Sequence, residues 1–512
     1  MRAKNEVILA RNGEERINST SRESLDFTRI FDDLEQVHRR VWGLLLSLSP
    51  QFDSGWEHYI FYLMGTQMVT DLTKGNITKS IIQFTIPLIL GNLFQLTYNA
   101  VDSIIVGRFA GKDALAAVGT ADPVMNLLIL GITGLCIGAS VLMSNFFGAG
   151  QIDRLRREVG TTLVLGSCLA AVVLIFGLIF SNRILILMKV PEEILNQAVK
   201  YLRIIFIGMP FTCFYNIFAA ALRSVGDSKT PIRFLMISSV INGCLDVLLV
   251  AVFKIGVAGA GIATVIAEGI SAILCLVYIY KKVPLLHLTA ADFVPDMELV
   301  KNTVSYGGVT ALQQCSQPIG KLLIQGVINT LGVSTIAAFN AVGKIEDFAL
   351  VPGRSISNAM MTFTAQNMGA QKKDRVKQGF KSGIMLELCY GVIIFAVLIF
   401  LAYPMLMLFG GDADMIDEGL KYFAVIAAFY WMPALTNGLQ GFFRGMGNMS
   451  ITLCGTLTQV SFRVIFTFVF VPYVGIKGVA IACIMGWIAM LALEIPYQRW
   501  LTHKKLVSNN KE

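Results

Sequence analysis

Long apolar stretches constrain the fold of this chain more than any other feature of its sequence. They recur between residues 80 and 500 with short polar gaps, and each has the roughly 20 mainly apolar residues that a helix needs to cross a bilayer. The stretches are apolar on nearly every face, whereas a surface helix of a soluble protein keeps a polar face. Only 15% of the residues are charged, against about 25% in soluble globular domains. The sequence therefore predicts an all-α integral membrane protein.

Twelve of these stretches can be delimited as transmembrane helices. Glycine and proline occur inside several of them, which membrane helices tolerate when neighbouring groups satisfy the freed backbone carbonyls. An even number of spans places the two termini on the same side of the membrane. The predicted spans are 79–107, 122–147, 158–180, 201–222, 234–253, 257–280, 303–329, 335–365, 380–402, 420–443, 450–472 and 476–498.

Basic residues in the loops indicate how these helices are oriented. Lys and Arg gather in alternate loops, as in 154–157 and 372–377, while the opposite set is poorer in them and its 403–418 loop is acidic. Because cytoplasmic loops carry the excess of Lys and Arg, we expect both termini in the cytoplasm and a multi-pass protein of the inner (plasma) membrane, surrounded by lipid. The net charge of +8 then reflects topology, and nucleic acid is not expected as a partner.

The two halves of the chain repeat each other. Each half has six spans, so the repeats insert in the same direction and are related by a pseudo-two-fold axis along the membrane normal. This predicts two pseudo-symmetric six-helix bundles around a central cleft. The matching segments are 148–154 with 369–375, 223–227 with 444–448, and 256–259 with 475–478.

The chain is accordingly divided into two bundles and three connecting or terminal segments. Residues 1–67 are charged and aperiodic, and we interpret them as an N-terminal extension or as a mispredicted start, with Met68 opening the membrane part. The alternative is a short amphipathic helix on the membrane surface at 41–48. The remaining divisions are an N-terminal six-helix lobe at 68–280, a cytoplasmic linker at 281–301, a C-terminal six-helix lobe at 302–502 and a cytoplasmic tail at 503–512.

Four segments carry motifs of a recognisable pattern: 86–95 and 98–107 in the first span, the Gly-Ala-Gly-Gln-x-Asp loop at 148–153, and 222–227. Together they resemble the multidrug and toxic compound extrusion (MATE) family, in its bacterial multidrug-exporter-like branch. The resemblance implies secondary active efflux of hydrophobic, often cationic, small organic compounds by antiport against H⁺ or Na⁺ through alternating access. It also implies a monomer without a cofactor.

Ionisable residues within the spans need a reason, because each costs about 2.5–3.5 kcal/mol at membrane depth. Asp102 lies in the first span, Asp246 in the fifth and Glu268 in the sixth. Asn242 shares a helix face with Asp246, and Thr264 shares one with Glu268, since each pair is four residues apart. Carboxylates beside amide or hydroxyl oxygens suit the binding of Na⁺ or of a proton.

The resemblance implies a cation-coupling site in the first half, with Na⁺ or a proton held at the two aspartates. The alternative for the aspartates is an interhelical hydrogen bond or ion pair, and Asn or Thr side chains often bridge membrane helices. The residues that match the family pattern are Asp102, Asn216, Asn242, Asp246 and Thr264.

Two further residues of the first half have open interpretations. Pro87 removes a backbone hydrogen bond from the helix that carries Asp102. The family reading is a hinge that bends when the Asp102 region changes protonation, and the alternative is a static kink. Glu268 lies outside the family pattern and is either a cation ligand or a charge that faces the cavity.

The second half carries different charges. Lys321 lies roughly where the repeat places Asp102, and Arg463 lies roughly where it places Asn242. Glu346 and Asp347 either pair with Lys344 or face the cavity and attract cations. We therefore expect cation coupling to be a property of the first half.

Several function classes have no support in the sequence. The chain has no Gly-x-x-x-x-Gly-Lys-Ser/Thr loop for ATP, and its four histidines lie outside the spans. We therefore expect no enzyme. Two rival functions remain: a non-transporting binding protein, and a flippase for lipid-linked saccharides from the same superfamily. The flippase needs a cationic cavity, for which the candidates are Lys321, Lys344, Arg354 and Arg463.

Overall fold

The computed structural model describes residues 70–409 and 412–507. Within these ranges the chain is nearly all helical and contains no strand. The expectations for residues 1–67, including the surface helix at 41–48, lie outside the described residues.

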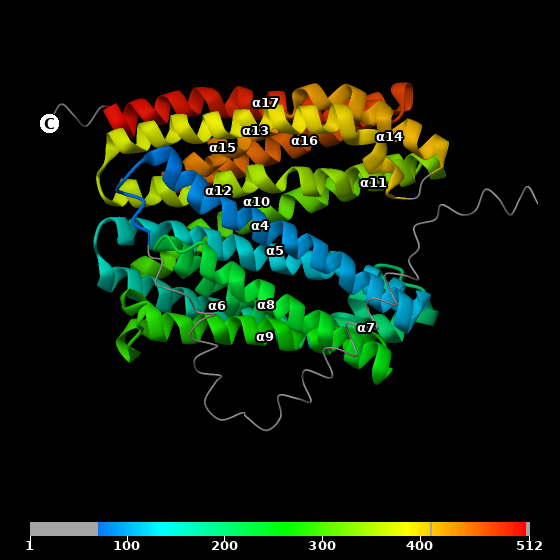
Figure 1. Ribbon diagram of the computed structural model, residues 1–512, viewed down its shortest axis with the longest axis horizontal. Coiled ribbons are helices and arrows are strands. Elements are labelled where there is room, and N and C mark those ends of the chain that lie inside the picture. The colour runs from blue at the N-terminus through cyan, green and yellow to red at the C-terminus, as the bar shows by residue number, and fades with distance from the viewer. Residues whose placement is uncertain (1–69, 410–411, 508–512) are drawn as a thin grey trace, which may run out of the picture. The chain divides into compact units, whose positions relative to one another are not determined.

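The first half contains six long helices that run side by side (Figure 1). In two of them the last turns widen into π helix, which often marks functional positions. The elements are α4 (Ile77–Ile105) continued by η1 (Val106–Ala110), α5 (Lys112–Gly148), α6 (Ile152–Leu187), α7 (Glu192–Ser224), α8 (Lys229–Asp246) continued by η2 (Val247–Val252), and α9 (Val257–Lys282).

The second half contains six further spans, of which two are interrupted. Two 3-10 turns, η3 (Pro284–Leu286) and η4 (Ala290–Phe293), lead into it. The elements are α10 (Met297–Ile328), α11 (Val333–Ala349) with α12 (Val351–Gly369), α13 (Lys373–Met407), α14 (Ala413–Ile426) with η5 (Ala427–Phe429) and α15 (Trp431–Gly445), α16 (Met449–Val474), and α17 (Ile476–Thr502) with η6 (His503–Val507).

Every predicted span coincides with a helix or with a pair of helices. The helices extend beyond the apolar stretches. At the start of α4 a polar residue caps the helix, since Asn76 accepts a hydrogen bond from the backbone N–H of Lys79. By length and composition alone, nine helices of the described ranges can cross a membrane. The other three predicted spans are the glutamine-rich α10 and the two interrupted ones.

The interruption between α11 and α12 has a local cause. Leu350 separates the two helices, and Pro352 follows at the second position of α12, where it has no backbone N–H to donate. The Tyr390 hydroxyl on α13 donates a hydrogen bond to the carbonyl of Ala349, the last residue of α11. A side chain from the neighbouring helix thus supports the break. In the first half, by contrast, α4 continues as helix through Pro87.

The two halves meet where α5 packs against α10 and α12, and where α4 packs against α12. The closest approach lies at the end of the helices that bears the loops 149–151, 225–228, 370–372 and 446–448, called the basic end below. A Cβ atom at Gly148 would lie 1.9 Å from the carbonyl oxygen of Gln366, and one at Gly369 would lie 1.9 Å from that of Asn145. The backbones of α5 and α12 therefore touch, and only glycine fits at the two crossing positions.

We expect Gly148→Ala to destabilise the protein by pushing α5 away from α12. Overpacking of a tight contact typically costs about 1–3 kcal/mol, which should lower the melting temperature of the purified full-length protein in detergent. Gly119→Ala is the matched control, because Gly119 lies on the same helix and a Cβ atom there meets nothing within 4 Å. Equal melting temperatures for the two variants would contradict the close contact.

Candidate functional site

A pair of carboxyl groups forms the centre of the first half's polar cluster. Asp102 on α4 and Asp246 on α8 face each other within hydrogen-bonding reach. Asp246 and Asn242 have no exposed surface. Both carboxyl oxygens of Asp246, Oδ1 of Asp102 and both polar atoms of the Asn242 amide are buried without a hydrogen-bond partner among the described residues.

This lack of partners defines what the cluster can do. A buried polar group left without a partner costs about 1–3 kcal/mol, and two facing carboxylates also repel each other. A shared proton would convert one carboxyl into a donor for the other. A small cation would instead take the free carboxylate and amide oxygens as ligands, as hard cations do. The arrangement thus suits either H⁺ or Na⁺.

Thr264 joins the cluster through a tyrosine that sequence reasoning missed. Tyr98 lies one turn before Asp102 on α4, and its hydroxyl interacts with the Thr264 side chain on α9. The Thr264 hydroxyl donates to the carbonyl of Ala260 at 3.0 Å, which leaves its oxygen free to accept from Tyr98. Tyr98 could have been found from the sequence, because it lies four residues before Asp102 and therefore on the same face of the helix. Two other missed residues near the acids are Tyr201 on α7 and Asp122 on α5.

Asn216 and Glu268 lie at the edge of this cluster, where Glu268 also interacts electrostatically with Tyr98. The Asn216 amide donates to the backbone carbonyl of Thr212 at 2.8 Å, within its own helix α7. The Thr212 hydroxyl donates in turn to Oε2 of Glu268 on α9. The structure therefore joins four of the five family-pattern residues around the Asp102 pair and ties Asn216 to the α7–α9 contact, beside Glu268.

The second half has an internally balanced cluster at the related position. Oε1 of Glu346 accepts hydrogen bonds from Tyr422 at 2.9 Å and from Tyr430 at 2.7 Å. The Arg463 guanidinium interacts electrostatically with the same carboxylate and with both tyrosines, and it also hydrogen-bonds Cys483. Arg463 follows Asn242 by 221 residues, the spacing of the repeat. A fixed positive charge thus stands in the second half where the first half has an amide.

Lys321 and Asp347 form an ion pair with 4.0 Å between Nζ and Oδ2. Their side chains are 53% and 43% exposed, so the pair contributes little to stability, in the range of about 0–1 kcal/mol. Asp347 thus pairs with Lys321 on α10. Its sequence neighbour Lys344 is exposed.

Three fully buried glutamates were not singled out from the sequence, although each interrupts or borders an apolar run. Glu158 on α6 accepts a hydrogen bond from Thr303 on α10 at 2.7 Å. Glu494 on α17 lies within 3.5 Å of the Gln440 amide and is attracted by Arg444. Glu387 on α13 has no described donor for either oxygen. A glutamate within an apolar stretch is visible in the sequence, but only the fold shows which side chains surround it.

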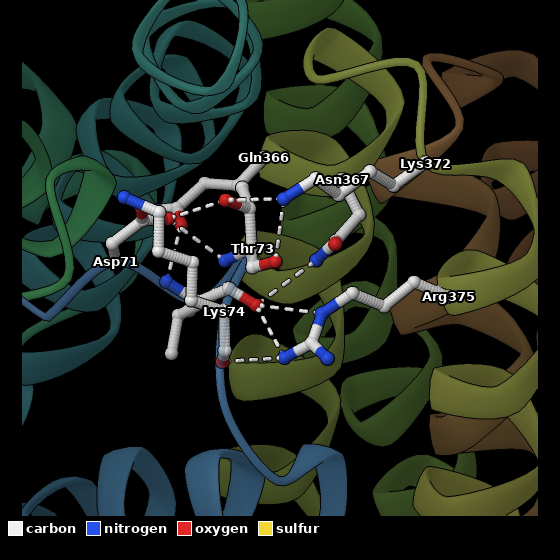
Figure 2. A network of polar contacts seen from close by, with 8 residues as sticks. Asp71, Thr73, Lys74, Gln366, Asn367, Lys372 and Arg375 are labelled. Carbon is white, nitrogen blue, oxygen red and sulfur yellow. Dashed lines mark hydrogen bonds and ion pairs between the residues drawn. The ribbon is translucent and has the colours of Figure 1, made fainter.

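The segment 71–75 before α4, called the strap below, is held by the second half at the basic end (Figure 2). Arg375 on α13 donates to the carbonyl oxygens of Leu72 at 3.1 Å, Lys74 at 2.6 Å and Gly75 at 2.8 Å. Its guanidinium also lies 5.5 Å from the ring centroid of Phe363. One arginine therefore holds the carbonyl groups of three residues in an otherwise irregular segment.

Other side chains of the second half complete this contact. Lys372 donates to the Thr73 carbonyl at 2.8 Å. Gln366 accepts from the backbone N–H of Leu72 at 3.1 Å and donates to the carbonyl of Ser224 at 2.7 Å. Gln366 thus links α12 both to the strap and to the end of α7, so the basic end is closed by contacts between the halves.

The strap also stabilises itself. The Asp71 carboxylate accepts from the backbone and the hydroxyl of Thr73 at 2.9 and 2.6 Å, and its other oxygen pairs with Lys74 at 3.0 Å. Burial raises the pKa of Asp71, but the hydrogen bonds from Thr73 and Lys74 outweigh it, so the net pKa is lowered. Asp71 is therefore ionised at neutral pH and keeps the turn closed.

Comparison with known proteins gives concordant matches. The profile of a protein family described as MatE matches residues 87–248 and 310–469, one segment in each half. The probable multidrug resistance protein YoeA of Bacillus subtilis (strain 168) is 32% identical over 344 residues, which cover 66% of this chain and 74% of that protein. The probable multidrug resistance protein YpnP of the same organism is 29% identical over 435 residues, covering 84% and 96%.

A solved structure shows the same fold. It is described as the outward-facing conformation of a multidrug resistance MATE family transporter of the MOP superfamily. It superposes with a TM-score of 0.80 at 23% identity, over 86% of this chain and 99% of that one. This likeness confirms the predicted fold class: an all-α membrane protein with twelve helices in two pseudo-symmetric six-helix bundles around a central cleft.

Proposed function

The chain belongs to the MatE family, and on this premise we propose that it exports hydrophobic, often cationic organic compounds in exchange for H⁺ or Na⁺. The curated relatives named as multidrug resistance proteins support export of such compounds. The proposal includes a position in the inner (plasma) membrane with both termini in the cytoplasm. The observation that carries the coupling is the Asp102–Asp246 pair with its unpartnered oxygens.

The coupling follows from the charge of this pair. Two like charges about 4 Å apart repel by roughly 4 kcal/mol at the effective dielectric of a protein site. A bound proton or Na⁺ removes this repulsion and lets α4 and α8 stay together. Release of the ion restores it and favours separation of the two helices. Pro87 weakens the backbone of α4 between this pair and the strap, so a bend of α4 there would carry the change toward the basic end.

Transport in sealed vesicles with one gradient imposed at a time tests the proposal. We expect the full-length protein in liposomes to drive ethidium uphill under one of the two gradients, because the two carboxyl groups can bind H⁺ or Na⁺ and the gradient of the coupling ion supplies the energy. An ionophore that collapses the effective gradient should stop the movement. Protein-dependent uptake driven by neither gradient would contradict antiport.

The flippase alternative loses support from the arrangement of the basic residues. Lys321 is paired with Asp347, and Arg463 is attracted by Glu346. Of the four basic residues proposed to line a cavity for a phosphate-bearing lipid, only Lys344 and Arg354 then remain without an acidic partner named above. Translocation of a fluorescent lipid-linked saccharide in the same liposomes would reinstate the alternative.

A further inference from the structure

Glu387 is a buried acid of the second half that the proposed coupling site does not use. It lies on α13, has no exposed surface, and neither of its carboxyl oxygens meets a donor among the described residues. Asp102 and Asp246 lie on helices of the other half. Glu387 therefore needs an explanation of its own.

Three helices of the second half shape the surroundings of Glu387. A Cβ atom at Gly353 on α12 would lie 3.1 Å from Oε2 of Glu387 and 3.1 Å from the amide nitrogen of Asn437. A Cβ atom at Gly438 on α15 would lie 3.3 Å from Cγ of Glu387. Glycines on both facing helices thus leave room for the carboxyl group, and Asn437 points to the same place.

No charge among the described residues balances an ionised Glu387. Its neighbour Tyr390, one turn along α13, directs its hydroxyl to the Ala349 carbonyl instead. Arg354 on α12 is exposed, and Arg444 on α15 lies two turns away, beside Glu494. Among the other packed elements, α4 carries Lys79 near its start, and Tyr430, which follows η5, donates to Glu346. A buried carboxylate without a countercharge is costly, so the neutral acid is the form that fits this site.

We propose that Glu387 is a proton-binding residue of the second bundle. It holds its proton while α12, α13 and α15 are packed as in this structure. When these three helices move apart, water reaches the carboxyl group, its O–H bond breaks, and the proton leaves as hydronium while the carboxylate becomes hydrated. This inference rests on the proposed antiport and adds a proton site to it.

The position of Glu387 links it to the contact between the halves. On α12, Ser355 accepts a hydrogen bond from Asn92 of α4 at 3.2 Å, one turn from the break at Leu350. On the same helix, Ser357 donates to the carbonyl of Asn437 at 2.6 Å. The helix that α4 contacts is therefore the helix that encloses Glu387. A change of charge at Glu387 would loosen α12 and transmit the change to α4.

The number of protons exchanged per substrate tests the proposal. Full-length protein in liposomes is given a substrate gradient that opposes a pH gradient, and the point of zero net ethidium flux yields the ratio. Glu387→Gln keeps the shape of the side chain but cannot ionise, so the ratio should fall by about one proton. Glu494→Gln is the matched control: this acid is equally buried, but the Arg444 guanidinium supplies a countercharge, so its replacement should leave the ratio unchanged.

A second measurement covers the case in which Glu387→Gln does not fold. The infrared band of the protonated Glu387 carboxyl group in the wild-type protein should shift in Glu387→Asp, which keeps an ionisable group. An unshifted band in Glu387→Asp, or a wild-type ratio in Glu387→Gln, overturns the proposal. Failure of the antiport itself is distinguishable, because Asp102→Asn would then leave transport intact.

Discussion

Cells that express the Asp102→Asn or the Asp246→Asn variant should retain as much ethidium as cells without the protein. Each substitution keeps the size of the side chain but removes one of the two facing carboxyl groups. The remaining acid then has no like charge to repel when the ion leaves, so binding and release of H⁺ or Na⁺ no longer moves α4 relative to α8. We expect the loss of gradient-driven export to be complete for both variants.

The control for this prediction is Asp374→Asn. Asp374 is an 85% exposed acid in the first turn of α13, where it pairs with Lys377, and exposed pairs of this kind contribute little. This variant should export ethidium like the wild type. Normal efflux by both the Asp102 and Asp246 variants, at wild-type expression, would show that the coupling site lies elsewhere.

Arg375→Ala should release the strap from the second half. The guanidinium makes charge-assisted hydrogen bonds to three carbonyl groups, and each bond to a charged group contributes about 1.5–3 kcal/mol. Loss of even one such bond raises the released population about tenfold, since 1.4 kcal/mol corresponds to that factor. The contact between the halves at the basic end should open correspondingly.

Limited trypsin digestion of the purified full-length protein measures this release. Cleavage after Lys74, within the strap, should be at least about tenfold faster in Arg375→Ala than in the wild type. Lys377→Ala removes a nearby basic residue whose side chain contacts Asp374 and not the strap, so its cleavage rate should stay at the wild-type level. An unchanged rate in Arg375→Ala would mean that Lys372 and Gln366 suffice to hold the strap.

The helices were predictable because the bilayer imposes a length and an apolar composition on each of them. The interruptions were not. Residues 335–365 read as one span, yet the helix breaks at Leu350, where Pro352 withholds an N–H and Tyr390 from another helix supports the free carbonyl. Pro352 is visible in the sequence, but the hydroxyl that supports the break comes from a residue 41 positions away in the chain.

The candidate site divides in the same way. The four-residue spacing of Asn242 and Asp246 predicted a shared helix face without any structure. No sequence spacing predicted that Asp246 on α8 would meet Asp102 on α4. Nor did any spacing predict that Asn216 would instead bond within its own helix α7. Whether the residues of the first-half cluster act together in coupling remains a prediction for the transport experiments above.

The sequence by itself determined the membrane class, the twelve spans, the repeat and the family, because these follow from local composition and from motifs that recur along the chain. Only the tertiary structure decided which side chains meet. It placed two aspartates face to face, balanced Glu346 with Arg463 and two tyrosines, and left Glu387 between glycines without a partner. The physical reason is that helix packing sets contacts between residues far apart in the chain, and burial there decides whether a charge finds a partner.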